Sequence, residues 1–322
     1  MNTPKILVVG ALGQIGSELV TELCLQKGVE NVIASDIRAE EEVNIEAKYL
    51  TLNIMDKEKL YEIIHEYHIG TIYNLAAVLS ATGEKNPMFA WKLNMEGLLN
   101  TLEAAKDISH LTQIFWPSSI AVFGPHSPRK NTPQYCVMDP NTVYGISKLA
   151  GERWCEYYAE KHKIDVRSIR YPGLIGYKSA PGGGTTDYAV HIYHYAVQQK
   201  PYECFLSENT ALPMMYMEDA IRATIQLMDA PSEKIENRSS YNLSGISFSP
   251  KQVVESIRKH IPDFACTYKP DFRQAIADSW PASIDDTPAT IDWGWQAEYN
   301  LEKMTEIMLE NIAKQYPKVR AI

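Results

Sequence analysis

Tyr144 and Lys148 are four residues apart, a spacing that places both side chains one turn apart on the same face of a helix. An unperturbed tyrosine has a pKa of about 10, and ionising it near neutrality requires a shift of roughly 2 to 3 units, or about 3 to 4 kcal/mol. A neighbouring ammonium group helps to supply this energy, so the pair could remove a proton from an alcohol. Alone, such a pair usually marks a solvated helix face. Ser118 and Ser119 strengthen the signal because they add hydroxyl groups at the end of a predicted strand.

A glycine-rich segment, Gly10-Ala11-Leu12-Gly13-Gln14-Ile15-Gly16, directly follows the first predicted strand and opens the first predicted helix. The first glycine permits a sharp turn, the second lets the backbone approach a pyrophosphate, and the third lets the helix pack close to the strand. Free N–H groups at the helix N-terminus then favour the phosphate charge. A purely structural turn is the alternative, but the position between strand and helix favours a dinucleotide cofactor.

Asp36 lies twenty residues after Gly16, at the end of the second predicted strand, where its carboxylate can accept hydrogen bonds from an adenosine ribose. The same charge repels a 2′-phosphate, so the sequence favours NAD over NADP. Arg38 could bind that phosphate if Asp36 pointed away, and Asp36 could instead cap a loop or helix. The other cofactor contacts that we predict follow the second, third and fourth strands: Ile37, Asn53, Ile54, Leu75, Ala76 and Ala77.

Short β-branched segments alternate with longer segments of helical periodicity through the first half of the chain. The predicted strands are 5–9, 31–34, 49–52, 71–75, 113–117 and 166–170, and the predicted helices are 14–26, 56–68, 87–106 and 144–162. This pattern predicts an α/β fold with a Rossmann-like, doubly wound parallel sheet, which binds ligands beyond the carboxyl ends of its strands.

The alternation stops after Pro172, where a glycine cluster at 182–184 precedes helices mixed with short strands. We therefore expect a smaller, mixed α/β substrate-binding domain in the C-terminal half. The expected boundaries are residues 1–176, with a returning segment at about 214–246, for the NAD-binding domain, and residues 177–213 and 247–322 for the substrate-binding domain.

The composition excludes several other classes of protein. The chain has 322 residues and a net charge of −9, from 31 basic and 40 acidic residues, which disfavours binding to nucleic acid. Its five cysteines are odd in number and widely scattered, so they suggest neither a disulfide framework nor a zinc ribbon. No signal peptide is evident, and no apolar run approaches the roughly 20 residues of a membrane span. We expect a cytoplasmic protein, or a mitochondrial matrix protein if the chain is a trimmed eukaryotic form.

The sequence resembles the extended short-chain dehydrogenase/reductase superfamily, in the branch that includes nucleotide-sugar epimerases, through GALGQIG, NLAA, PSSIAVFG and YGISK. It is more similar still to the short-chain type of L-threonine 3-dehydrogenase. The segments that carry this narrower resemblance are VLSATGE, NTVYGISK, RYPGLIGYKSAPGGGTTDYAV, LPMMYMEDAIRATIQLM, YNLSGISFSP and PDFRQAIADSWPASIDD. Several lie on the predicted substrate side, which differs greatly between branches, so the resemblance is specific.

The resemblance implies oxidation of L-threonine at C3 by NAD, without a metal, to L-2-amino-3-oxobutanoate. That product either decarboxylates to aminoacetone or passes to a CoA-dependent ligase that yields glycine and acetyl-CoA. In this interpretation the Tyr144 phenolate is the general base, Lys148 binds the ribose hydroxyls and lowers the tyrosine pKa, and Ser119 orients the substrate oxygen.

The resemblance also implies further contacts and an assembly. The cofactor neighbours would be Asn94 and the turn from Tyr171 to Leu174, and the substrate pocket would include Ser80, Ser118, Gly184, Thr185, Thr186 and Trp280. The loop that contains the glycine cluster would close over the substrate. A homodimer would form through the predicted helix at 87–106 and the helix that carries Tyr144.

Two other functions share parts of this pattern. A nucleotide-sugar 4-epimerase or dehydratase would have the same cofactor site and Tyr/Lys pair, but residues 177–215 contain only Lys178 and Lys200 as basic groups for a nucleotide diphosphate. A non-catalytic NAD-binding regulator would be expected to lack Tyr144 or Lys148. Two histidine pairs, His65 with His68 and His191 with His194, lack the carboxylate or cysteine pattern of a zinc site.

Overall fold

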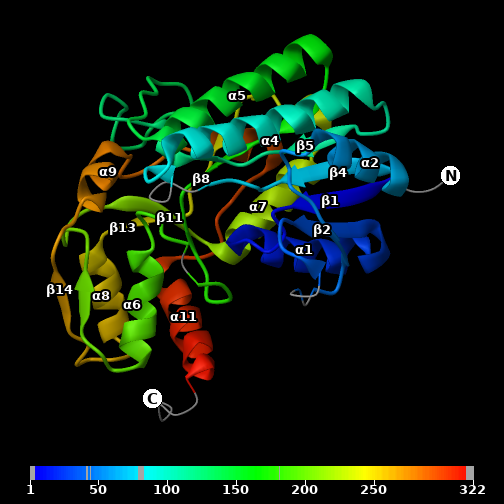
Figure 1. Cartoon of the computed structure of the whole chain (residues 1–322). Helices are drawn as coiled ribbons and strands as arrows, with labels where there is room; N and C mark the ends of the chain where they lie inside the picture. Colours follow the sequence, from blue (N-terminus) through cyan, green and yellow to red (C-terminus); the bar gives the residue numbers. More distant parts are fainter. Residues whose placement is uncertain (1–3, 41–42, 44, 79–82, 181, 317–322) are drawn as a thin grey trace.

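The computed structural model describes residues 4–40, 43, 45–78, 83–180 and 182–316 (Figure 1). Its first half contains a six-stranded, fully parallel sheet with the strand order β3-β2-β1-β4-β5-β7. The strands are β1 (Lys5–Val9), β2 (Val32–Asp36), β3 (Lys48–Thr51), β4 (Ile69–Asn74), β5 (Gln113–Phe115) and β7 (Asp165–Arg167). This order confirms the predicted doubly wound sheet, and it reverses between β1 and β4, where such sheets bind ligands.

Helices cover both faces of this sheet. Alternate residues of β1 point to opposite faces, so Leu7 and Val9 contribute to one buried core and Val8 to the other. The helices on the first face are α2 (Lys57–Tyr67), α4 (Pro87–Asp107) and α5 (Val143–His162), and those on the second are α1 (Gln14–Lys27) and α7 (Met217–Asp229). Figure 1 shows α4 and α5 side by side, and α1 packs against α7.

Two predicted strands are wrong in extent, because the chain bends out of the large sheet at their carboxyl ends. The predicted strand 166–170 is divided between β7 and β8 (Ile169–Tyr171), and the predicted strand 113–117 ends at Phe115, before β6 (Ser118–Ser119). Pairing explains the bend, since the Ser168 carbonyl accepts from the Tyr241 N–H on β12 (Tyr241–Asn242) at 2.9 Å. Strands β12, β8 and β6 thus form a small parallel sheet of their own.

The second half surrounds a third core, built mainly on α6, α8 and α11. Strand β11 pairs with β9 in parallel and with β13 in antiparallel fashion, and β10 pairs with β14. The strands are β9 (Gly173–Ile175), β10 (Tyr202–Cys204), β11 (Leu212–Tyr216), β13 (Ile246–Phe248) and β14 (Cys266–Tyr268). The helices are α6 (Tyr188–Val197), α8 (Pro250–Arg258), α9 (Arg273–Ser279), α10 (Thr287–Trp293) and α11 (Leu301–Gln315). Short 3₁₀ helices occupy Val29–Asn31, Ile120–Val122 and Ser232–Lys234.

None of the helices in the described ranges is long and apolar enough to cross a lipid bilayer.

Candidate active site

The turn between β1 and α1 forms a cradle for a dinucleotide at the switch point of the sheet. Gly10 has a φ of +78°, and a Cβ at this position would lie 3.0 Å from the Ala76 nitrogen. A Cβ at Gly16 would lie only 2.2 Å from the Gly10 carbonyl oxygen, so a side chain there would separate α1 from the turn. Gly13 caps α1 without a side-chain hydrogen bond, which leaves the first N–H groups of the helix for an anion. These features fit the pyrophosphate of a dinucleotide.

Asp36 projects from the end of β2 at the side of this turn. Its Oδ2 accepts from the Leu12 N–H at 3.2 Å, and its Oδ1 accepts from the Ile37 N–H at 2.9 Å. The Arg38 guanidinium donates to the Leu12 carbonyl oxygen at 3.1 Å, and its Nε is 3.9 Å from Asp36 Oδ1. The site therefore has a fixed carboxylate suited to ribose hydroxyls, with an exposed cation beside it.

A cavity of about 220 Å³ lies beside Asp36. Its lining residues are Val9, Gly10, Gly13, Asp36, Ile37, Arg38, Leu52, Asn53, Ile54, Leu75, Ala76, Ala77 and Leu93. Sequence reasoning missed Val9, Leu52 and Leu93, which are neighbours or helical partners of predicted contacts. We call this space the adenosine cavity.

Three predicted cofactor residues line neither the adenosine cavity nor the second cavity, which is described below. Leu12 acts through its backbone on Asp36, and Gly16 packs beneath the turn. The Asn94 side chain is buried on α4, where it accepts from the Val78 N–H at 2.8 Å and donates to the Ser147 hydroxyl at 3.0 Å. Asn94 therefore joins α4 to the helix that carries Tyr144.

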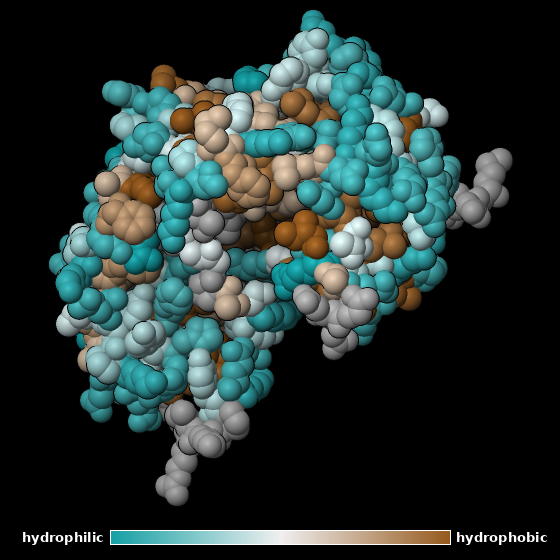
Figure 2. Space-filling model, viewed as in Figure 1, coloured by the Kyte–Doolittle hydropathy of each residue, from teal (hydrophilic) through white to brown (hydrophobic). Residues whose placement is uncertain are grey.

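A second cavity, of about 160 Å³, adjoins the carboxyl ends of the strands and receives residues from both halves of the chain. Its lining residues are Gln14, Ile15, Leu75, Ala77, Pro117, Ser118, Ser119, Ile120, Tyr144, Lys148, Tyr171, Pro172, Gly173, Leu174, Gly184, Thr185, Thr186, Asp187 and Trp280. Figure 2 shows a hollow near the middle of the face seen there, with hydrophobic side chains inside it. We call the second space the catalytic cavity.

Tyr144 and Lys148 meet in the catalytic cavity on the first turns of α5, which Thr142 caps by accepting from the Gly145 N–H at 3.1 Å. Burial raises the pKa of Tyr144 to about 12, while a hydrogen bond with the Ser119 hydroxyl acts in the opposite direction. Tyr144 therefore keeps its proton in the ligand-free protein, and a positive charge must come close before it can act as a base.

Lys148 is the nearby source of positive charge. Its Nζ donates to the Pro117 carbonyl oxygen at 2.6 Å and lies 5.6 Å from the centre of the Tyr144 ring. Burial lowers the pKa of Lys148 to about 7, although the Cys155 and Glu152 charges act to raise it. The Lys148 ammonium group can therefore give up its proton near neutral pH. While it is protonated, it places a positive charge next to Tyr144.

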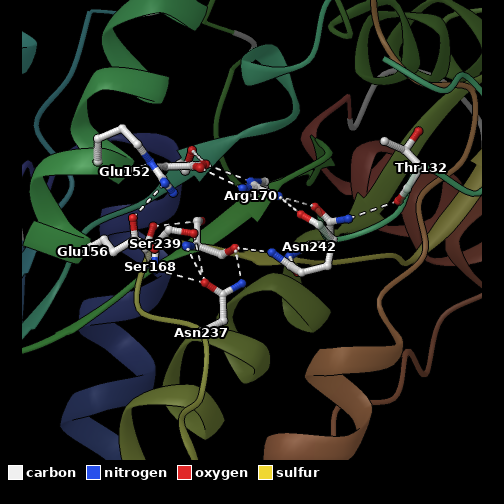
Figure 3. A network of polar contacts seen from close by, with 12 residues as sticks. Thr132, Glu152, Glu156, Ser168, Arg170, Asn237, Ser239 and Asn242 are labelled. Atoms are coloured by element: carbon white, nitrogen blue, oxygen red, sulfur yellow. Dashed lines mark hydrogen bonds and ion pairs between the residues drawn. The ribbon is translucent and has the colours of Figure 1, made fainter. Parts of the chain in front are cut away.

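Ser118 and Ser119 are adjacent in sequence but differ in their contacts. The Ser118 hydroxyl donates to Glu152 Oε1 at 2.6 Å, in a buried position, whereas Ser119 contacts Tyr144. Arg170 binds the same Glu152 through two hydrogen bonds of 2.8 Å and also donates to Asn242 Oδ1 at 3.0 Å (Figure 3). The side chains of Glu152 and Arg170 are at most 1% exposed. Ser118 therefore braces β6 against α5 and β8.

The substrate side of the catalytic cavity is rich in hydroxyl and N–H groups. The Thr185 side chain is almost fully buried, and its Oγ1 has no hydrogen-bond partner within the described residues. Asp187 Oδ2 accepts from the Gly183 and Gly184 N–H groups at 2.7 Å each, which shapes the turn before α6. Trp280 adds a buried aromatic wall. The predicted contact Ser80 lies outside the described residues.

Sequence reasoning missed Asp187 and two neighbours of predicted residues, Pro117 and Ile120. Asp187 accepts hydrogen bonds from the backbone of the turn that precedes α6, a contact that no short sequence pattern predicts. It is the one carboxylate among the described residues that line the catalytic cavity.

Comparison with known proteins links these features to a family. A sequence model described as the NAD dependent epimerase/dehydratase family matches residues 6–244. An uncharacterized epimerase/dehydratase of Staphylococcus saprophyticus is 48% identical over 311 residues, which cover 96% of this chain and 97% of that protein.

Two solved structures are similar over nearly the whole chain. The holo form of a GalE-like L-threonine dehydrogenase from Cupriavidus necator is 55% identical, with a TM-score of 0.94, over 96% of this chain and 100% of that one. The apo form of a monomeric L-threonine 3-dehydrogenase from a metagenome is 50% identical, with a TM-score of 0.92, over 96% of this chain and 99% of that one.

Proposed function

Because this chain belongs to the NAD-dependent epimerase/dehydratase family, we propose that it is an L-threonine 3-dehydrogenase that oxidises C3 of L-threonine to L-2-amino-3-oxobutanoate. The family match confirms the predicted superfamily and the NAD cofactor. The observation that carries the substrate proposal is the similarity to two L-threonine dehydrogenases, at least 50% identical over 96% of the chain. At that coverage the similarity extends to both halves of the chain, which together line the catalytic cavity.

The chemistry of the proposed reaction centres on Tyr144. NAD, when bound, supplies the hydride acceptor. Tyr144 removes the proton of the threonine hydroxyl, and the Ser119 hydroxyl, which contacts Tyr144, holds the substrate oxygen in place. Lys148 holds the ribose hydroxyls and adds positive charge beside the Tyr144 ring, which favours the phenolate.

The other end of the substrate is a zwitterion. We assign its carboxylate to Thr185 and Thr186, because the Thr185 hydroxyl is buried in the cavity wall without a protein partner among the described residues. Asp187 supplies the negative charge that an ammonium group requires, and Trp280 packs against the small side chain.

The main alternative is a nucleotide-sugar 4-epimerase or dehydratase. The size and charge of the catalytic cavity disfavour it, since about 160 Å³ suits a small amino acid better than a nucleotide diphosphate sugar. Lys148 is also the only basic side chain among the described residues that line this cavity, so no further cation is present there for a diphosphate.

The decisive experiment measures NADH formation with purified protein, NAD and each of L-threonine, L-serine, L-allo-threonine and UDP-galactose. We expect turnover of L-threonine, with L-serine and L-allo-threonine much slower and UDP-galactose not epimerised. If UDP-galactose is epimerised while threonine gives no NADH, the proposal is wrong and the alternative holds.

We further propose a homodimer through α4 and α5. Met88 and Trp91 on α4 and Trp154 and Tyr157 on α5 are between 37% and 75% exposed, an unusual amount of apolar surface for two neighbouring helices. One 50% identical relative is monomeric, so the mass in solution is the appropriate test. Light scattering after gel filtration should give twice the chain mass in the wild type and the single mass in Trp154→Glu.

The product of the proposed reaction is a β-keto acid, which readily loses carbon dioxide. We therefore also propose that it either decarboxylates to aminoacetone or is consumed by a CoA-dependent ligase that forms glycine and acetyl-CoA.

A further inference from the structure

Glu18 is a buried carboxylate on the helix that receives the cofactor. It lies one turn after Gln14, which lines the catalytic cavity, and its side chain is only 7% exposed. Its Oε2 is 3.1 Å from Nζ of Lys178, whose side chain is 46% exposed. Burial raises the pKa of Glu18 even though Lys178 acts to lower it. Because an ion pair with one exposed partner adds little net stability, the pair calls for an explanation other than folding.

Lys178 belongs to the segment 176–187 between β9 and α6, of which the structure describes residues 176–180 and 182–187. The far end of this segment contains Gly184, Thr185, Thr186 and Asp187, which line the catalytic cavity. Its near end is fixed from two sides. A Cβ at Gly176 would lie 3.4 Å from Glu18 Oε1, and the Tyr177 carbonyl oxygen accepts from Gln315 on α11 at 2.8 Å.

The other charged groups near this contact have partners of their own. Glu18, Lys178, Glu218 and Arg222 share a hollow of about 330 Å³ with Tyr299. Tyr299 donates to Glu218, and Arg222 binds Asp219 at 2.5 Å. Glu18 and Lys178 are each other's only ion-pair partners within the described part of the chain.

We propose that Glu18 is a positioning residue, which through Lys178 holds the base of segment 176–187 against the cofactor helix and so sets Thr185 and Thr186 for the substrate. The helix that receives the cofactor thereby also fixes the start of the segment that binds the second ligand. The substrate part of this inference rests on the proposed function, whereas the attachment of the segment to α1 does not.

The kinetic test uses Glu18→Gln, Lys178→Met, the double variant and Lys178→Arg. We expect each of the first two to raise the KM for L-threonine about tenfold, with kcat within about threefold and the Kd for NAD within about twofold of the wild type. The KM for L-threonine in the double variant should not exceed that of the more impaired single variant, since both substitutions remove the same contact. Lys178→Arg keeps the ion pair and should stay near the wild type.

Glu22→Gln is the matched control. Glu22 lies one turn further along α1 and lines the same hollow, but within the described ranges its side chain bonds only to Gln26 of its own helix. Its KM for L-threonine should equal that of the wild type. An unchanged KM in Glu18→Gln and Lys178→Met, additive effects in the double variant, or an equal loss of NAD affinity would each overturn the positioning role.

A second measurement does not depend on turnover. Hydrogen exchange of the backbone amides at 182–187, with NAD present, should be about tenfold faster in Glu18→Gln and Lys178→Met than in the wild type and Glu22→Gln. Faster exchange in a protein that does not oxidise threonine would leave the positioning role standing and remove the proposed function. Unchanged exchange in a protein that does oxidise threonine would overturn the positioning role alone.

Discussion

The adenosine cavity is lined by glycines, apolar side chains and the Asp36 carboxylate at the ends of regular strands, whereas the catalytic cavity is lined by hydroxyl groups drawn from both halves of the chain. The first depends on the close approach of backbone to backbone, as at Gly10 and Gly16. The second depends on single atoms, such as the Thr185 Oγ1.

This difference determines how each cavity responds to substitution. Substitutions other than to proline leave the backbone N–H groups in place, so the adenosine cavity is sensitive mainly to added bulk and to the charge at Asp36. A hydroxyl group can be removed without changing the shape of the wall, so the catalytic cavity can lose one function at a time. The following predictions test whether the two cavities are separable in this way.

The largest effect is expected from Tyr144→Phe, which removes the proposed general base and leaves the ring. We expect kcat for L-threonine to fall by about 10³-fold, with the Kd for NAD within about twofold of the wild type. Steady-state kinetics and a fluorescence titration with NADH measure the two quantities. Tyr157→Phe, on the exposed side of the same helix, is the control. Normal turnover in Tyr144→Phe would remove the phenolate from the mechanism.

Asp36→Ala should alter the adenosine cavity alone. Loss of a charged hydrogen-bond acceptor should reduce the preference for NAD over NADP by about 10- to 100-fold, with the KM for L-threonine unchanged. The ratio of kcat/KM for the two cofactors measures this preference. In the double variant with Arg38→Ala, any increase of kcat/KM with NADP should disappear. An unchanged cofactor ratio would argue against ribose recognition by Asp36.

Thr185→Val should alter the catalytic cavity alone. Valine has nearly the same shape, so we expect the KM for L-threonine to rise about tenfold through loss of one hydrogen bond, without a lower melting temperature. Thr305→Val is the contrast, because that buried hydroxyl bonds Tyr193 and Ser256 and lies outside the cavity. It should lower the melting temperature and leave the KM unchanged. The reverse pattern would contradict the substrate assignment.

The smallest effect is expected on stability in Glu18→Gln. Burial raises the folded-state pKa of Glu18 above its ordinary value of 4.5, so the folded protein binds more protons than the unfolded chain just above that pH. The Glu18 charge therefore costs stability increasingly as the pH rises through this window. The glutamine variant should melt at an equal or higher temperature than the wild type above pH 4.5, and the two should converge below it. Lower stability of the variant at neutral pH would indicate a structural ion pair.

Most of the lining of the adenosine cavity could be predicted from the sequence, because the patterns that indicate it are local. The glycine spacing, the position of Asp36 and the alternation of strands and helices each depend on neighbours in the chain, and the sheet confirms the alternation. The placement of Tyr144 and Lys148 on one helix face follows from their spacing in the same way.

Sequence reasoning was incomplete where distant segments decide the structure. The chain bends at Ser168 because Tyr241, far along the sequence, pairs with it instead of β5. The Ser118 hydroxyl turns to Glu152 because Arg170 holds that carboxylate in place. Asp187 lines the cavity only because the turn before α6 folds over it. None of these contacts has a signature within a short stretch of sequence.

The contact of Ser118 with Glu152 and Arg170 has a consequence for protein engineering. A designer who grafted Ser119, Tyr144 and Lys148 onto another scaffold would copy the proposed reacting groups but leave behind the ion pair that braces the strand beneath them. The smallest group of residues that could be transferred is therefore larger than the proposed reacting residues. It also includes the buried Glu152 carboxylate and Arg170 guanidinium, which do not line the catalytic cavity.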